Sequence, residues 1–283
     1  MTGKIKNKGH LVLIGGAEDR KGEKIVLNEL VRINNARNVV IIPSATLYPA
    51  ECGEDYYFAF RDIGLKNIDI LDIRKSSDAS TPENLKKIDR ADMIFFTGGD
   101  QVRLTKILLK THLTERIRER FEKEGLTIAG TSAGASAAAN PMTYDGDTKG
   151  LIKGSVKYAE GFGFIENITI DTHFVARGRL GRLTQFLCNG YTNRGIGIGE
   201  NTSITISADN RFYVTGSGIV TVVSTEHLTF SNFDKIEEQD RIIIDGIRLG
   251  FLQHGAEFDM DNWITIGYQN AALSKTEMPA GKS

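Results

Sequence analysis

The first two hundred residues alternate between short apolar runs and longer amphipathic segments. The apolar runs are continuous rather than alternating, which is typical of strands that helices cover on both faces. This rhythm predicts a parallel sheet with helices packed against its two faces. The expected strands are 11–14, 39–42, 68–71, 93–96 and 127–129, and the expected helices are 24–34, 56–63, 82–88 and 102–123.

Beyond residue 201 the sequence becomes rich in β-forming residues, with runs at 202–206, 211–214, 219–223, 241–244 and 247–252. The last two runs flank Asp245-Gly246, which predicts a β-hairpin. No Pro-rich or Ser-rich linker precedes this region, and no internal repeat is visible. We therefore expect one domain over residues 1–283, in which an α/β core (1–201) carries a β-rich extension (202–283).

The overall charge disfavours polyanionic partners. Lys and Arg number 35 against 36 Asp and Glu, a formal net charge of -1, so general attraction to nucleic acid or to an anionic membrane is not expected. Cys52 and Cys188 are too few for a disulfide framework or a four-ligand zinc site, and no metal is expected. The apolar run at 11–14 is too short for a signal peptide, and no stretch could span a membrane, which predicts a cytoplasmic protein.

The pentapeptide Gly130-Thr131-Ser132-Ala133-Gly134 follows an expected strand and opens a run of small residues that can start a helix. A strand, a sharp turn and a helix form a nucleophile elbow, in which the hydroxyl of Ser132 is exposed and N–H groups at the helix start face the substrate carbonyl. The same pentapeptide also suits an ordinary turn that lets a helix pack closely on a sheet.

A serine hydroxyl needs a base to accept its proton. The chain has five histidines. His173 stands at the end of an expected strand, among apolar neighbours, and is the best-placed base, although a buried structural histidine would fit the same pattern. The other four are expected at the surface or in turns: His10, His112, His227 and His254.

The third member of such a triad is an acid, and several acids lie near strand ends or glycine-rich segments: Asp145, Asp147, Glu160, Asp171 and Glu200. Glu200 follows Gly195-Ile196-Gly197-Ile198-Gly199, where alternating glycines indicate close packing on one strand face. With Glu200 as the acid, the order along the chain is Ser, His, Glu. An α/β-hydrolase has the order Ser, acid, His and a His-Gly-Gly-Gly segment, so that fold is disfavoured.

Several motifs together resemble those of the cyanophycinases, serine peptidases related to the α-aspartyl dipeptidases. They are Leu13-Ile14-Gly15-Gly16-Ala17-Glu18-Asp19, Ile42-Pro43-Ser44-Ala45, Phe96-Thr97-Gly98-Gly99-Asp100-Gln101, Gly130-Thr131-Ser132-Ala133-Gly134-Ala135, Asp171-Thr172-His173 with Arg177, Arg179 and Arg182, and Gly197-Ile198-Gly199-Glu200. The resemblance runs almost end to end. It implies a flavodoxin-like sheet akin to the class I glutamine amidotransferases, a triad of Ser132, His173 and Glu200, no cofactor, and a homodimer.

The family's substrate is cyanophycin, a poly-aspartate backbone whose side chains carry arginine through isopeptide bonds, and its products are β-aspartyl-arginine dipeptides. The resemblance implies that Gln101 contacts substrate, that Asp171 either receives a substrate cation or braces the arginines, and that the N–H groups of Gly99 and Ala133 form the oxyanion hole. The guanidinium groups of Arg177, Arg179 and Arg182 suit carboxylates. Thr172 stands where many cyanophycinases have glutamine, so a substrate contact is altered.

Three other functions fit parts of the sequence. The nearest is a related peptidase that acts on other acidic peptides, such as Asp-X dipeptides. A nucleotide- or phosphate-binding protein could use the Gly15-Gly16 and Gly98-Gly99 loops, but neither makes a phosphate-binding fingerprint. A binder of cyanophycin without activity would have no use for Ser132, His173 and Glu200.

Overall fold

The computed structural model describes residues 8–146 and 150–269. Its main sheet has nine strands in the order β19-β18-β13-β12-β1-β5-β4-β2-β3. The last five are parallel, as predicted, and β12 runs antiparallel to β1. The parallel strands are β1 (Leu11–Ile14), β2 (Asn38–Ile42), β3 (Asn67–Ile70), β4 (Met93–Phe96) and β5 (Thr127–Thr131).

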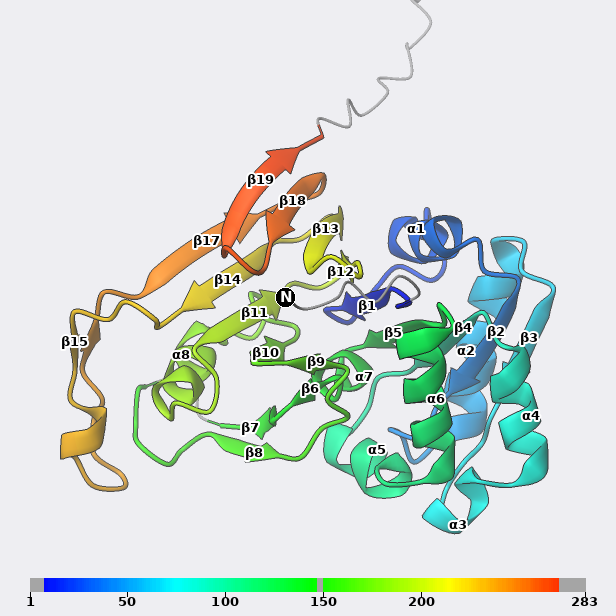
Figure 1. Ribbon diagram of the computed structural model, residues 1–283, viewed down its shortest axis with the longest axis horizontal. Helices are drawn as coiled ribbons and strands as arrows, with labels where there is room; N and C mark the ends of the chain where they lie inside the picture. The colour runs from blue at the N-terminus through cyan, green and yellow to red at the C-terminus, as the bar shows by residue number, and fades with distance from the viewer. Residues whose placement is uncertain (1–7, 147–149, 270–283) are drawn as a thin grey trace, which may run out of the picture.

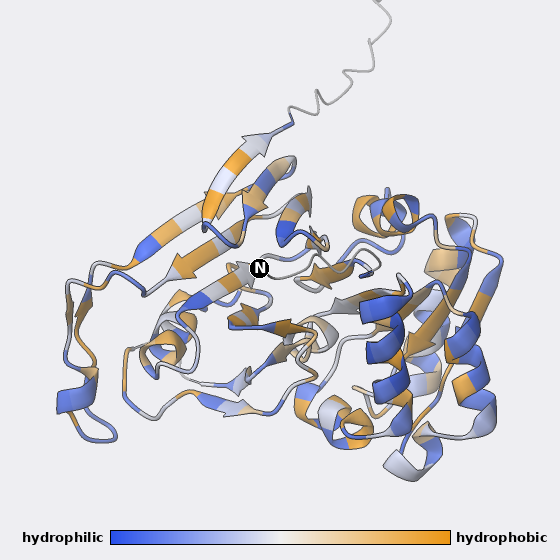
Figure 2. Cartoon of the chain, viewed as in Figure 1, coloured by the Kyte–Doolittle hydropathy of each residue, from blue (hydrophilic) through white to orange (hydrophobic). Residues whose placement is uncertain are grey.

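Helices cover both faces of the parallel half (Figure 1). On one face, α1 (Ile25–Asn34) and α2 (Pro49–Asp62) pack against Val12, Ile41 and Phe95. The opposite face buries Leu13, Ile94 and Ile128 under the remaining helices of this half. These helices are α3 (Ser76–Ala79), α4 (Pro82–Arg90), α5 (Gln101–Leu108), α6 (His112–Lys123) and α7 (Ala133–Ser136). Figure 2 shows α6 as largely hydrophilic, in keeping with a helix that buries only one side.

The segment predicted as one helix over 102–123 is two helices, α5 and α6. Lys110, at φ 60°, lies in the left-handed region between them. Thr111 then caps α6 by accepting a hydrogen bond from the Thr114 N–H at 3.3 Å. A threonine cap is a recognised helix start, so the break has a sequence signal that periodicity alone does not register.

A second sheet, to the left of the parallel half in Figure 1, has the order β10-β11-β14-β17. Its strands are β10 (Ile168–Asp171), β11 (Arg194–Ile198), β14 (Val220–Ser224) and β17 (Arg248–Leu252), and α8 (Leu180–Cys188) packs on it. The β-rich region is therefore present. Strands from both sides of residue 201 pair with one another in both sheets.

The rest of the β-rich region extends the main sheet through β12 (Thr202–Ile206), β13 (Arg211–Gly216), β18 (Ala256–Asp259) and β19 (Ile264–Tyr268). Shorter elements complete the description: β6 (Ala139–Asn140), β7 (Met142–Asp145), β8 (Lys157–Ala159), β9 (Ile165–Glu166), β15 (Phe230–Ser231), β16 (Ile244–Asp245) and the 3-10 helix Phe233–Lys235. No helix within residues 8–146 and 150–269 is long and apolar enough to cross a membrane.

The predicted hairpin at Asp245-Gly246 is wrong. The chain does turn there, with Gly246 at φ 83° and its N–H donating to Asp245 Oδ1. The flanking strands nevertheless part: β16 pairs with β15, whereas β17 pairs with β14. The buried residues Val222 and Val223 of β14 provide long-range packing that the local turn signal does not encode.

Candidate active site

Ser132 occupies a sharp turn between β5 and α7, at φ 49° and ψ -107°. This sparsely populated conformation for a serine is of the kind that clusters at functional sites. The two glycines of the pentapeptide make the turn possible, because a Cβ on Gly130 would collide with the Gly134 backbone and a Cβ on Gly134 with the Phe96 backbone. The predicted elbow geometry is thus present, although α7 has only four residues.

His173 lies beside Ser132, with Nε2 at 2.9 Å from the serine Oγ. It follows β10 by two residues, at φ 49°, and its N–H donates to the Gly15 carbonyl at 2.8 Å. The side chain of His173 is only 12% exposed. The histidine is therefore held in position from its backbone and from its ring.

Glu200 binds the other nitrogen of the same ring, with Oε1 at 2.7 Å from His173 Nδ1. It follows β11, whose glycines allow close packing as expected: a Cβ on Gly197 would overlap the Phe174 ring, and one on Gly195 would press on Leu183. Ser132, His173 and Glu200 thus form a continuous hydrogen-bonded row. Such a row can take the proton of the serine and stabilise the resulting imidazolium.

The other candidate acids bind elsewhere. Asp145 pairs with Lys157, which together with a backbone N–H lowers the pKa of that carboxyl. Glu160 pairs with Lys110 at 2.7 Å. Asp147 lies outside the described residues, and Asp171 pairs with arginines, as described below.

The remaining histidines lie away from this row. His10 bonds with Asn34 at 2.7 Å, and His254 accepts a hydrogen bond from the Gly216 N–H. His112 and His227 are exposed.

Gly16 is the residue against which the imidazole packs. A Cβ on Gly16 would overlap Cε1 and Nε2 of His173, the atoms at the serine end of the ring. The carbonyls of Gly15 and Gly16 accept hydrogen bonds from the N–H groups of His173 and Asn201 respectively. The loop after β1 therefore connects the base to the segment that carries Glu200.

Gly16→Ala is expected to lower kcat/KM by about 100-fold or more, because the new methyl group pushes the imidazole away from Ser132. A misplacement of about 1 Å is enough for a loss of this size. Gly64→Ala is the matched control. Gly64 has the same φ of 95°, so an alanine there also enters the left-handed region, but a Cβ on Gly64 meets nothing within 4 Å. Similar losses of activity in the two variants, measured on folded protein, would show that backbone strain and not the imidazole position is responsible.

The sequence predicts that two N–H groups near Ser132, those of Gly99 and Ala133, form an oxyanion hole. Neither the Gly99 N–H nor the Ala133 N–H has a partner among the described residues, and Ala133 begins α7. The Ser132 N–H, by contrast, donates to the Ile14 carbonyl at 3.0 Å. Gly99 also approaches Ala45 so closely that a Cβ would collide with the Ala45 backbone. Both N–H groups predicted from the sequence are thus free to donate.

Asp171 is fully buried and binds two of the predicted arginines. Arg182 forms a two-pronged contact with it through Nε and Nη2, and Arg179 adds Nη1 at 3.2 Å. Arg182 is itself buried, and burial lowers the pKa of Arg179 against the opposing attraction of Asp171. Asp171 and Arg182 therefore brace the segment behind His173, and the expectation that Arg182 grips substrate does not match its contacts.

Arg177 differs, since its side chain is exposed and has no hydrogen bond or ion pair among the described residues. The Nε and Nη2 donors of Arg179 likewise have no hydrogen-bond partner among the described residues. These two guanidinium groups can still receive a carboxylate.

Thr172 and Gln101 are also placed by the structure. Thr172 is buried, and its hydroxyl lies 3.4 Å from that of Ser136, so it points into the protein. Gln101 begins α5 and donates from Nε2 to the Thr143 carbonyl at 3.0 Å, which orients its amide oxygen. Of the two, Gln101 is the half-exposed side chain.

Glu18 is a site-supporting residue to which the sequence reasoning assigned no role. Its buried carboxyl accepts hydrogen bonds from Tyr56 and from Thr131, the residue before Ser132. Burial, together with the adjacent Glu18, holds the pKa of Tyr56 well above its ordinary value, so the phenol remains a donor. An acid four residues after a buried strand was the available signal, since a buried carboxyl requires donors.

Neither thiol is suited to replace the serine as nucleophile. Burial raises the pKa of Cys188 to about 11 and also raises the pKa of Cys52. Both are free thiols and protonated at neutral pH, whereas reactive cysteines are thiolates. Within the described ranges, no cluster of three or more His, Cys, Asp or Glu could hold a metal ion.

The family model described as peptidase family S51 matches residues 11–214. The chain belongs to this family. It is therefore a peptidase, and the resemblance to the cyanophycinases is confirmed. A cyanophycinase of Geminocystis herdmanii is 32% identical over 255 residues, which cover 89% of this chain and 94% of that protein. A cyanophycinase of Trichormus variabilis is 34% identical over 256 residues, which cover 89% of this chain and 86% of that protein.

A solved structure of a peptidase from an acI-B1 Actinobacterium has the same fold. The TM-score is 0.65 at 23% sequence identity, and the match covers 89% of this chain and 97% of that one. The predicted fold class, parallel strands flanked by helices with a β-rich C-terminal region, is confirmed, within a main sheet that is mixed.

Proposed function

We propose that this S51 peptidase is a serine exopeptidase that hydrolyses cyanophycin to β-aspartyl-arginine dipeptides through an acyl-enzyme. The observation that carries the proposal is the hydrogen-bonded row of Ser132, His173 and Glu200 in a chain about a third identical to cyanophycinases. The row needs no cofactor, because the serine, the base and the acid supply the nucleophile and both proton transfers.

In the first half of the proposed reaction, Ser132 Oγ attacks the carbonyl carbon of a backbone amide while His173 Nε2 takes the hydroxyl proton. The carboxylate of Glu200 stabilises the imidazolium through Nδ1–H. The N–H groups of Gly99 and Ala133 donate to the developing oxyanion. The imidazolium then protonates the leaving amine, the C–N bond breaks, and the acyl group remains on Ser132.

In the second half, water attacks the ester and gives a proton to His173 Nε2. The tetrahedral intermediate collapses, the C–O bond to Ser132 breaks, and the imidazolium returns the proton to the serine oxygen. Because each half uses the same oxyanion donors, one arrangement serves both steps.

The arginines divide into a substrate pair and a structural residue in this proposal. Every unit of the polymer carries a free arginine carboxylate, and Arg177 and Arg179 have guanidinium donors available for it. Gln101 presents an amide at the same end of the sheet as Ser132, from the start of α5 after β4. Arg182 acts indirectly, by holding Asp171.

Arg177→Ala should therefore affect mainly activity, whereas Arg182→Ala should affect mainly stability. Arg177→Ala should leave unfolding free energy within about 0.5 kcal/mol. On a substrate with a free arginine carboxylate, it should lower kcat/KM by a factor that corresponds to about 1–3 kcal/mol. On the amide of that substrate, kcat/KM should change little. Arg182→Ala should lower unfolding free energy by about 3–5 kcal/mol, because it leaves a buried carboxylate short of its main partner. Urea unfolding and parallel kinetics on both substrates measure this contrast, and equal profiles would contradict it.

Incubation with insoluble cyanophycin, followed by mass analysis of the soluble fraction, tests the proposed function. Release of β-aspartyl-arginine is the expected result. Hydrolysis of Asp-X dipeptides but not of the polymer would favour the related acidic-peptide peptidase. Binding of the polymer without any release would favour a non-catalytic binder. We further propose that the protein is a homodimer, as the resemblance implies, and that it is cytoplasmic, as its sequence predicts. Light scattering tests the oligomeric state.

A further inference from the structure

A cleft of about 810 Å³ opens at the carboxyl ends of β2, β3 and β4, beside the proposed oxyanion hole. Gly99 forms part of its wall. The neighbouring Gly98 is so close to the nucleophile that a Cβ there would lie 3.4 Å from the Ser132 Cβ. The cleft therefore begins next to the reacting atoms and leads away from them.

Four cationic side chains line this cleft, which we call the cationic cleft: Arg74, Lys75, Arg103 and Lys106. They come from two separate segments, the loop after β3 and helix α5. Lys75 and Lys106 are exposed, and their ammonium groups have no hydrogen bond or ion pair among the described residues. Two positive charges in the cleft are thus uncompensated by any neighbour that the structure describes.

The other two cations are held in place. Arg74 forms a two-pronged ion pair with Asp72, and Arg103 donates from Nε to the Thr46 carbonyl at 3.2 Å. The one acid that lines the cleft, Asp100, uses its Oδ1 to cap α5 through two backbone N–H groups. The net charge of the lining is therefore positive.

One wall of the cleft is apolar and open to solvent. Leu47 and Tyr48, at 71% and 68% exposed, follow β2 and face the cleft together with Val102 and Ile107. A tyrosine ring can receive a guanidinium on its face, and exposed apolar surface can cover an alkyl chain. The cleft thus combines carboxylate-binding cations with a surface suited to the rest of an arginine side chain.

We infer that the cationic cleft binds further units of the arginine-bearing polymer, each with a free carboxylate and a guanidinium, beyond the unit whose amide Ser132 attacks. Carboxylates of these units meet Lys75 and Lys106, and their side chains lie on the wall formed by Leu47 and Tyr48. The inference rests on the proposed function, and it adds a preference for long chains over short ones. Exposed charges are screened by salt, so this preference weakens as ionic strength rises.

The test compares the parent with Lys75→Gln/Lys106→Gln on synthetic chains of two and of eight β-aspartyl-arginine units. The parent should show a higher kcat/KM on the eight-unit chain. In the double variant, the ratio of kcat/KM on the eight-unit chain to kcat/KM on the two-unit chain should fall roughly fivefold, as expected for the loss of two exposed charge contacts. The change should come from a higher KM for the eight-unit chain and not from kcat. An eight-unit chain with amidated arginine carboxylates should show no difference between parent and variant.

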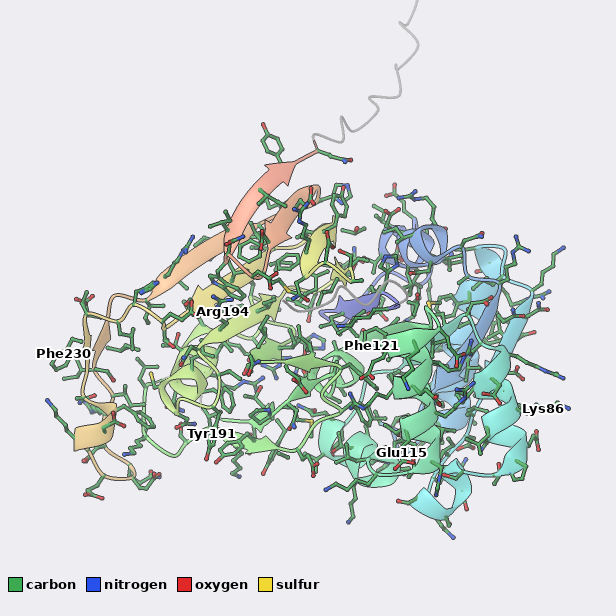
Figure 3. The ribbon with its side chains drawn as sticks, in the orientation of Figure 1. Lys86, Glu115, Phe121, Tyr191, Arg194 and Phe230 are labelled. Carbon is green, nitrogen blue, oxygen red and sulfur yellow. The ribbon has the colours of Figure 1, made fainter. Side chains whose placement is uncertain are left out.

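Lys86→Gln is the matched control, since Lys86 is an exposed lysine that projects outward from α4, away from the cleft lining (Figure 3). It should leave the ratio of the two kcat/KM values unchanged. An unchanged ratio in the double variant, with both chains cleaved and its melting temperature equal to that of the parent, would overturn the cleft assignment alone. Cleavage of neither chain by the parent would instead overturn the proposed function, and the inference with it.

Calorimetry supplies a second readout that does not depend on turnover. In a Ser132→Ala background, the eight-unit chain should bind more tightly than the two-unit chain, and the two lysine substitutions should remove most of this difference. Equal affinity for both chains before the lysines are changed would contradict the inference.

Discussion

Ser132→Ala is expected to lower kcat/KM on cyanophycin by about 10⁴-fold or more, as removal of the nucleophile does in other serine hydrolases. Alanine fits the turn as serine does, because both carry a Cβ and share the cost of φ 49°. The loss should therefore come without a change in the urea midpoint. Activity within tenfold of the parent would eliminate Ser132 as nucleophile.

Ser136→Ala is the control for this experiment. Ser136 is buried in α7, four residues from the nucleophile, and among the residues that the structure describes its hydroxyl is hydrogen-bonded only to that of Thr172. Its replacement should leave kcat/KM within about threefold of the parent, since a weak hydroxyl contact is the main loss. A serine-directed phosphonate should label Ser132 in the parent and label neither Ser136 nor Ser203, which are both buried.

His173→Ala should have the second largest effect, close to that of Ser132→Ala. The double variant should be no worse than either single one, because residues that act as one unit are strongly non-additive. Additive losses in the double variant would mean that His173 acts independently of the serine.

Glu200→Gln should cost less than His173→Ala but still orders of magnitude, by removing the charge that stabilises the imidazolium. The same kinetics on Asp145→Asn provide the comparison, because Asp145 pairs with Lys157 at the surface. If Glu200→Gln is silent while Asp145→Asn inactivates the enzyme, the acid is misassigned.

Much of the parallel half could be predicted because continuous apolar runs have few alternatives once both faces must be covered. The strands Leu11–Ile14 and Met93–Phe96 match their predicted limits. The hairpin at Asp245-Gly246 failed since turn chemistry fixes a turn but not the partners of its strands, which depend on the long-range packing of β14. A local sequence signal can therefore predict a turn, whereas contacts between distant residues determine which strands pair.

The row of Ser132, His173 and Glu200 could be placed because each residue stands at a strand end with a distinctive local sequence. The pairing of Arg182 with Asp171 could not. A cluster of arginines in a sequence indicates an anion-binding site. Only the fold shows that Arg182 is buried against the carboxyl of Asp171, eleven residues earlier in the chain. The lysines of the cationic cleft carry no motif at all, as they meet only when β3 and β4 lie in one sheet.

The proposed nucleophile and base come from different sheets. Ser132 follows β5 of the main sheet, whereas His173 and Glu200 follow β10 and β11 of the second sheet. The backbone bonds from His173 to Gly15 and from Asn201 to Gly16 join the two at this point. The 2.9 Å contact between Oγ and Nε2 therefore depends on how the sheets are docked. A slight shear between them would silence the enzyme while every catalytic side chain remained intact, so substitutions far from the substrate can tune its rate.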